Sequence, residues 1–195
     1  MRADDYYKLT RRHPAELARQ LQLDMAACAL LAADQTVAEF VMCLALDKQF
    51  PAALAMLAHA LPKREAVWWG CIAVRRANSP DPNSAADTAL SAAEAWVYHP
   101  DEQSRQPIGE AATKAGLNTP AGWAAIAAFW SGGSLAPPDS PVVPPQDDLT
   151  AKAVAGATTL AAIDDDQQRA AGKSIAFIKV ALDIALGGDG RNVPV

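Results

Sequence analysis

Residues 61–76 read LPKREAVWWGCIAVRR, and they place two of the five tryptophans side by side in an apolar run with a basic pair at each end. An apolar run of this kind belongs in a protein core, whereas basic side chains belong at the surface. Pro62 is suited to open a helix, because its ring fixes φ near the helical value. The stretch therefore predicts a helix over residues 62–77 that serves the core and the surface together.

The two tryptophans cannot face the same neighbour on this helix. Successive residues of an α-helix point about 100° apart, so Trp68 and Trp69 lie on different sides. Either the helix is central and buried all round, or one of the two rings lies at the surface. The apolar run favours a central, buried helix.

The two basic pairs differ in how well they suit the helix dipole. The C-terminal pair is favoured there, whereas Lys63 and Arg64 lie in the first turn, where the dipole disfavours a cation by ~0.3–1 kcal/mol each. Pairing with Glu65 or with an acidic residue elsewhere in the fold would explain this position, and docking of an acidic partner protein is the alternative. Arginine and aromatic side chains often carry the binding energy of interfaces. The candidate partner-binding residues are Lys63, Arg64, Trp68, Trp69, Arg75 and Arg76.

Composition predicts an all-helical fold. Hydrophobic residues make up 51% of the chain and aromatic residues 6%, with alanine the most frequent apolar residue. Alanine is the best helix former and is poor in strands. We therefore expect an all-α protein, an irregular multi-helix bundle of about nine helices or a short stack of helix pairs. Apolar spacing and cap residues place the helices at 14–33 (with a break near Asp24), 36–48, 51–61, 62–77, 85–98, 101–115 (kinked or divided at Pro107), 120–130, 149–163 and 165–186.

Residues 131–148 interrupt the helical pattern. They hold five of the 14 prolines, which prevents a helix and favours extended polyproline geometry. Overlapping P-x-x-P spacing runs through Pro138, Pro141 and Pro144. The segment is a linker, a strap over the protein's own surface or, less commonly, a ligand for an aromatic groove. It divides the chain into a main helical domain, 1–130, and a C-terminal helix pair, 149–187, packed on it, with a frayed tail at 191–195.

Charge and hydropathy exclude several classes of partner. The net charge of −5 comes without a basic stripe, which argues against nucleic acid. The apolar run 66–74 falls short of the ~20 residues of a membrane span, and residues 1–7 show no secretory signal. Three widely spaced cysteines are expected as small buried residues in a reducing compartment. We expect a cytoplasmic protein whose partner is another protein, with no nucleic acid and no membrane insertion.

The chain shows no catalytic, metal or nucleotide motif, so we expect no cofactor. Residues 172–174 resemble the end of a phosphate-binding loop, but Gln167 stands where that motif needs a glycine. Residues 131–134 follow a helix, whereas a serine nucleophile elbow follows a strand. None of the three histidines has a second histidine or a cysteine at helical spacing.

Residues 61–69, with the later stretches 119–123 and 129–134, resemble a family of uncharacterised bacterial proteins of about this length that is associated with type VI secretion gene clusters. The resemblance covers roughly residues 34–138. It implies a bacterial cytoplasmic accessory protein and carries over no catalytic residue.

Three functions are compatible with these features. The leading hypothesis is a non-enzymatic interaction protein: an adaptor, chaperone-like accessory or scaffold of a bacterial secretion system. The second is an immunity protein that neutralises a toxin, for which an acidic surface would suit a basic nuclease. The third is an enzyme whose site assembles only in the fold, for example from Glu65, a histidine and an arginine in one pocket.

Overall fold

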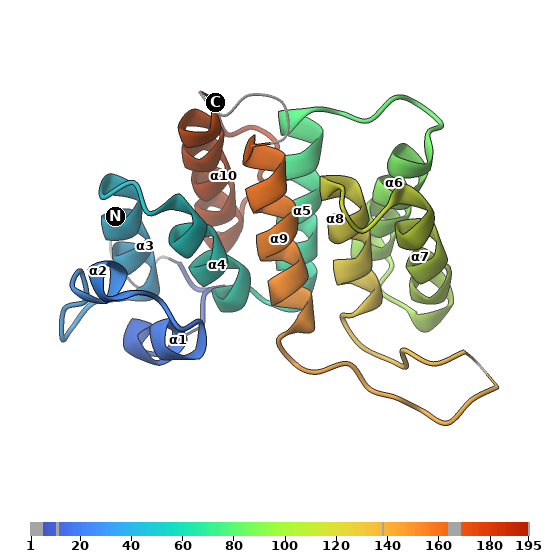
Figure 1. Ribbon diagram of the computed structural model, residues 1–195, viewed down its shortest axis with the longest axis horizontal. Helices are drawn as coiled ribbons and strands as arrows, with labels where there is room; N and C mark the ends of the chain where they lie inside the picture. The colour runs from blue at the N-terminus through green and yellow to red at the C-terminus, as the bar shows by residue number, and fades with distance from the viewer. Residues whose placement is uncertain (1–5, 11, 138, 164–168, 195) are drawn as a thin grey trace.

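The computed structural model describes residues 6–10, 12–137, 139–163 and 169–194, and within these ranges every regular element is a helix (Figure 1). The expected all-α class is therefore confirmed. The helices are α1 (Pro14–Gln20), α2 (Met25–Cys28), α3 (Val37–Leu46), α4 (Phe50–Ala60), α5 (Lys63–Ala77), α6 (Ala85–Tyr98), α7 (Glu102–Ala115), α8 (Pro120–Phe129), α9 (Leu149–Ile163) and α10 (Ala170–Ala185).

The earlier helices, α1 to α7, progress from one end of the long axis of the molecule to the other, and α8, α9 and α10 then return towards the middle (Figure 1). α1, α2 and α3 lie at one end, α6 and α7 lie at the other, and α5 and α9 lie between them. α9 packs against α4, α5, α8 and α10. The chain that follows the proline-rich segment thus returns to the centre of the fold, and its buried side chains join the same hydrophobic core as those of the earlier helices.

Small residues let the central helices approach closely. A Cβ added to Gly70 of α5 would lie 3.7 Å from Val154 Cγ1 of α9, which is ordinary contact distance. On another face of α9, a Cβ added to Gly156 would lie 3.2 Å from the ring of Trp123 on α8. Most of α8 is buried, as its apolar sequence predicts. Alanine and glycine therefore serve packing here as well as helix propensity.

The expected break near Asp24 is confirmed, because the Asp24 carboxylate accepts a hydrogen bond from the Ala27 amide at 2.8 Å and caps a new helix. That helix, α2, ends at Cys28 and does not continue to residue 33 as expected. α7 runs without interruption through Pro107, so the expected division there is wrong. A proline removes only one backbone donor, and Arg105 and Ile108 on either side of it are buried in the body of the protein.

The C-terminal tail is held against α5 rather than frayed. The Arg76 guanidinium donates hydrogen bonds to the carbonyls of Gly190, Arg191 and Val193 at 3.0, 2.9 and 3.0 Å. Three charge-assisted bonds from one side chain offset the entropy of ordering a short tail. The expectation of a frayed tail is therefore wrong for residues 191–194.

Two further expectations concern the burial of the cysteines and the start of the last helix. Cys71 is buried, but Cys28 is exposed at the end of the short α2 and Cys43 is partly exposed. The expectation of a buried cysteine is therefore confirmed for Cys71 and wrong for Cys28 and Cys43. The aspartates at the expected start of the last helix, 164–166, lie outside the described residues, and the described part of that helix begins at Ala170.

The proline-rich segment leaves the helices after α8 and returns to α9 as a long projecting loop (Figure 1). The Leu135 amide donates to the Val143 carbonyl at 2.8 Å and closes the base of the loop. Residues 139–144 beyond this base are exposed, so this part of the segment does not lie as a strap over the protein surface. Pro138, the first proline of the P-x-x-P series, is outside the described residues.

Candidate functional site

Trp69 is a core residue. Its side chain has no exposed surface, and its indole Nε1 donates to the Phe177 carbonyl of α10 at 2.9 Å. A buried indole needs such an acceptor, because an unsatisfied N–H in the core costs free energy. Trp69 thus joins α5 to α10 and does not reach the surface.

Trp68 is the tryptophan that reaches the surface. Its partly buried ring meets Tyr98 of α6 edge to face, with ring centroids 5.7 Å apart. Its Nε1 donates to the Asp189 carbonyl at 2.8 Å, and the Arg191 guanidinium lies 4.9 Å from the ring centroid. Of the two arrangements open to the tryptophan pair, the structure has one ring inside and the other at the surface.

The two arginines that end α5 are engaged within the chain. The Arg75 guanidinium pairs with Glu94 at 3.0 Å and with Asp87, both on α6, and these carboxylates raise its pKa further above the ordinary value. Arg76 holds the C-terminal tail. Both side chains therefore connect α5 to other parts of the fold.

The two cations that begin α5 are less engaged. Lys63 Nζ lies 4.0 Å from an Asp147 oxygen, and the Asp147 side chain is fully exposed, so this ion pair adds little stability. Glu65 pairs with Lys8 at 3.6 Å rather than with either of its basic neighbours on α5. Arg64 is exposed and forms no hydrogen bond or ion pair within the described ranges. Internal pairing therefore explains Lys63 only weakly and does not explain Arg64.

Arg64 and Trp68 line a hollow of about 360 Å³ in the protein surface. Lys8 from the N-terminal segment, Tyr98 from the end of α6 and Arg191 from the tail complete its polar and aromatic lining. Three cations meet two carboxylates here, in a chain of net charge −5. We call this the α5 hollow; its lining residues are Lys8, Arg64, Glu65, Trp68, Val97, Tyr98, Ile184, Gly188, Asp189 and Arg191.

The α5 hollow brings together residues that are distant in sequence. Trp68 and Asp189 are 121 positions apart, and no local pattern connects them. The sequence identified Arg64 and Trp68 but missed Lys8, Tyr98 and Arg191. Glu65 and two arginines line this hollow, but no histidine is among the described residues that do so.

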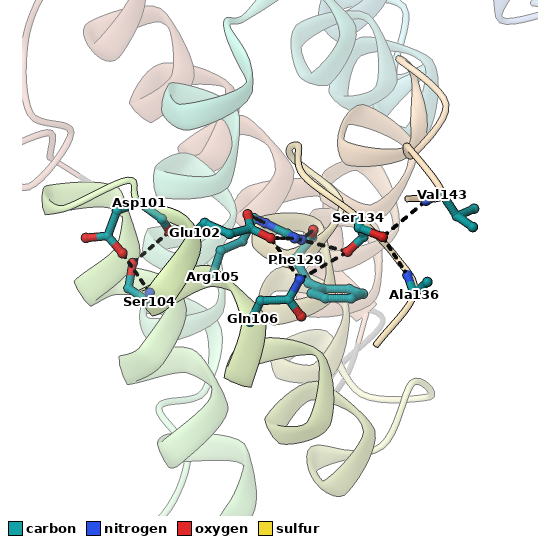
Figure 2. Close-up of polar contacts among 9 residues, drawn as sticks. All are labelled: Asp101, Glu102, Ser104, Arg105, Gln106, Phe129, Ser134, Ala136 and Val143. Atoms are coloured by element: carbon teal, nitrogen blue, oxygen red, sulfur yellow. Dashed lines mark hydrogen bonds and ion pairs between the residues drawn. The ribbon is translucent and has the colours of Figure 1, made fainter. Parts of the chain in front are cut away.

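A second polar cluster fixes the base of the proline-rich loop (Figure 2). Arg105 of α7 is only 3% exposed, and its guanidinium bonds the Glu102 carboxylate at 2.7 and 2.6 Å. It also donates to the Ser134 carbonyl at 3.0 Å and to the Phe129 carbonyl at the end of α8. One arginine thus ties α7, the end of α8 and the start of the loop together.

Gly133 allows the loop to pass close to this cluster. Its φ of +61° lies in the left-handed region, which other residues rarely adopt. A Cβ at this position would also collide with the Arg105 guanidinium and the Glu102 carboxylate. The Ser-Gly-Gly-Ser sequence that superficially resembles a nucleophile turn is therefore a close crossing of loop and helix.

Acid should weaken the Arg105 cluster. Hydrogen bonds from Arg105, followed by those from Gln106, lower the pKa of Glu102 from 4.5 to about 2. A carboxyl group whose pKa is lower in the folded protein than in the unfolded chain stabilises the fold at pH values above its unfolded pKa. That contribution is lost as the pH falls from about 4.5 towards 2. We expect the free energy of unfolding of the unmodified protein to fall more steeply across this window than that of Glu102→Gln, as measured by urea denaturation at a series of pH values.

Glu110→Gln is the matched control for this comparison. Glu110 lies on the same helix and also has a lowered pKa, but both it and its partner Lys114 are largely exposed. Solvent screens such a pair, so its loss should alter the pH dependence less. Parallel pH curves for the unmodified protein and Glu102→Gln would exclude Glu102 as a source of acid sensitivity.

The structure gives two further observations on membranes and metals. None of the described helices is long and apolar enough to cross a membrane. In the same ranges, no group of three or more His, Cys, Asp or Glu side chains could hold a metal ion.

Comparison with known proteins assigns a family. The sequence matches the model of a family of unknown function, DUF6931, over residues 40–185, which is more than half of the chain. The chain belongs to the DUF6931 family. The resemblance to an uncharacterised family is thereby confirmed. The DUF6931 match runs from within α3 to the end of α10, so it includes the proline-rich loop and α5 but not Lys8 or Arg191. No curated protein and no solved structure matches the chain.

Proposed function

We propose that this protein is a non-enzymatic interaction protein: an adaptor, chaperone-like accessory or scaffold of a bacterial, type VI-like secretion system that acts in the cytoplasm. It binds an acidic segment of another protein in the α5 hollow. The observation that carries this proposal is Arg64, an exposed arginine that lies beside a partly buried tryptophan and has no internal partner in the described part of the chain.

The charges of the α5 hollow favour an acidic partner. Lys8 and Glu65 pair with each other at 3.6 Å. The remaining charged side chains of the lining are two arginines, Arg64 and Arg191, and one carboxylate, Asp189. The local excess of positive charge stands out in a protein of net charge −5. A basic surface on an acidic protein steers acidic partners towards it and orients them on encounter.

The aromatic rings hold Arg191 in place before any partner binds. The Arg191 guanidinium lies 4.9 Å from the Trp68 ring centroid and 5.9 Å from that of Tyr98, and it donates to the Tyr98 hydroxyl. A side chain that is already held loses less conformational freedom on binding. Arginine next to aromatic side chains is also the composition typical of interface hot spots.

Charge reversal at Arg64 tests this proposal. Proteins that co-purify with the native chain are identified by mass spectrometry, and the Kd of the main partner is measured with purified components. We expect Arg64→Glu to weaken binding about tenfold or more, because it places a negative charge against the acidic segment. Arg19→Glu, at an exposed position on α1, carries the same charge change outside the hollow and should alter the Kd less than about twofold.

The outcome also separates the candidate roles. Equal affinity of Arg64→Glu and the unmodified protein, with unchanged circular dichroism, would exclude the α5 hollow as the binding surface. A partner from the secretion machinery would support the adaptor role. A toxin as the partner would support an immunity protein instead.

A further inference from the structure

The proline-rich loop offers a second, separate surface for recognition. We propose that residues 141–144 (Pro-Val-Val-Pro) are a docking segment that inserts into an aromatic-lined groove of a partner protein, a groove of the kind that reads polyproline II helices. This proposal does not rest on the α5 hollow, because different residues and different chemistry carry it.

The segment is exposed, which favours docking to another protein. Pro141, Val142, Val143 and Pro144 are all exposed, with 75% of Val142 and 49% of Val143 open to solvent. The loop carries this apolar segment away from the helices (Figure 1). The side chains of this segment are not part of the hydrophobic core, and exposed apolar patches often mark sites where another molecule binds.

Hydrogen bonds at the base of the loop pre-organise the segment. The Ser134 hydroxyl accepts hydrogen bonds from the Ala136 and Val143 amides, each at 3.1 Å, and thus joins the two sides of the loop at its base (Figure 2). The Ser134 carbonyl in turn accepts from buried Arg105 at 3.0 Å. A loop whose base is fixed in this way loses less entropy on binding than a free linker of the same sequence.

The spacing of the two prolines indicates the kind of groove that the segment fits. In a polyproline II helix, which has three residues per turn, Pro141 and Pro144 would lie on one edge and would fill neighbouring aromatic pockets. Proline has no backbone N–H, so a groove that covers these residues leaves no amide donor of theirs unsatisfied. Asp139 and Asp147 flank the segment and are exposed. The matching groove therefore combines aromatic walls with a neutral or basic rim.

Site-specific photo-cross-linking tests the proposal with the full chain. A benzophenone amino acid replaces Val142, the protein is illuminated in its native cells, and the cross-linked peptides are identified. We expect cross-links to a partner surface formed by Trp, Tyr or Phe side chains. Cross-links confined to this chain, or to a surface without aromatic residues, would overturn the proposal.

Binding of the captured partner, used as a purified probe, then tests the prolines. We expect Pro141→Ala/Pro144→Ala to raise the Kd at least tenfold while the thermal unfolding curve stays the same, because both positions are exposed. Pro80→Ala/Pro82→Ala removes two prolines from the surface loop between α5 and α6 and should leave the Kd unchanged. An unchanged Kd for the 141/144 variant would refute docking by this segment, and its comparison with Arg64→Glu shows whether the same partner also uses the α5 hollow.

Discussion

Replacing Trp69 with alanine is expected to lower the free energy of unfolding by about 3–5 kcal/mol, the usual cost of truncating a fully buried aromatic ring. The ring has no exposed surface and lies between α5 and α10. The substitution leaves a large cavity and also removes the indole hydrogen bond to the Phe177 carbonyl, which joins the two helices. Because small domains have only about 5–15 kcal/mol of stability, a loss of this size places the protein close to unfolding.

Two control variants separate the contributions of the ring and the hydrogen bond. Trp69→Phe fills part of the cavity but removes the indole hydrogen bond to the Phe177 carbonyl, so we expect a loss of about 1–3 kcal/mol. Trp68→Ala truncates the neighbouring, partly exposed ring and should cost about 1–2 kcal/mol, because less apolar area is buried there. Urea denaturation followed by circular dichroism measures all three variants. Equal losses for Trp68→Ala and Trp69→Ala would contradict the assignment of one core and one surface ring.

Replacing Arg105 with alanine is expected to cost about 2–4 kcal/mol, since a buried polar group that loses its charged partner costs ~1–3 kcal/mol. The carbonyls of Phe129 and Ser134 both lose the guanidinium that they accept from. Glu102 contributes less to the loss, because its side chain is 55% exposed and water can solvate it. The same urea denaturation experiment measures this loss.

The effect on the loop distinguishes this variant from simple destabilisation. If Arg105 fixes the base, hydrogen exchange at the Ala136 and Val143 amides should accelerate in Arg105→Ala more than exchange in the core of α9. Arg105→Lys keeps the charge but lacks the planar fork that reaches several acceptors, so we expect an intermediate result. Unchanged exchange at both amides would show that the Ser134 contacts hold the loop without Arg105.

Local chemistry accounts for the parts of the fold that the sequence predicted well. Thr36 and Glu39 form a capping box at the start of α3, and Ser84 and Thr119 cap α6 and α8. Pro62 and Asn78 lie directly before and after α5. These signals act within one turn of the chain, so they can be read without knowing what the helices pack against. The expected break near Asp24 has the same origin, whereas the continuity of α7 through Pro107 depends on the core around it.

The candidate site was predictable only in part, because most of its contacts are long-range. The unfavourable position of Lys63 and Arg64 at the start of a helix is a local signal, and Arg64 does line the α5 hollow. Nothing near Arg76 in sequence indicates that it holds residues 190–193. Likewise, Arg105 lies 29 positions from the Ser134 carbonyl that it fixes.

The sequence by itself determined that this protein is all-helical, where most helices begin and end, and that residues 131–148 interrupt them. Helix propensity, caps and prolines act locally, so these features need no tertiary contacts. Only the tertiary structure decided which tryptophan lies at the surface, which basic residues are already paired and how the proline-rich loop leaves the body. The first two depend on α6, α10 and the C-terminal tail reaching α5, and the third depends on Arg105 of α7 reaching the start of the loop. These contacts join distant parts of the chain, and no local pattern encodes them.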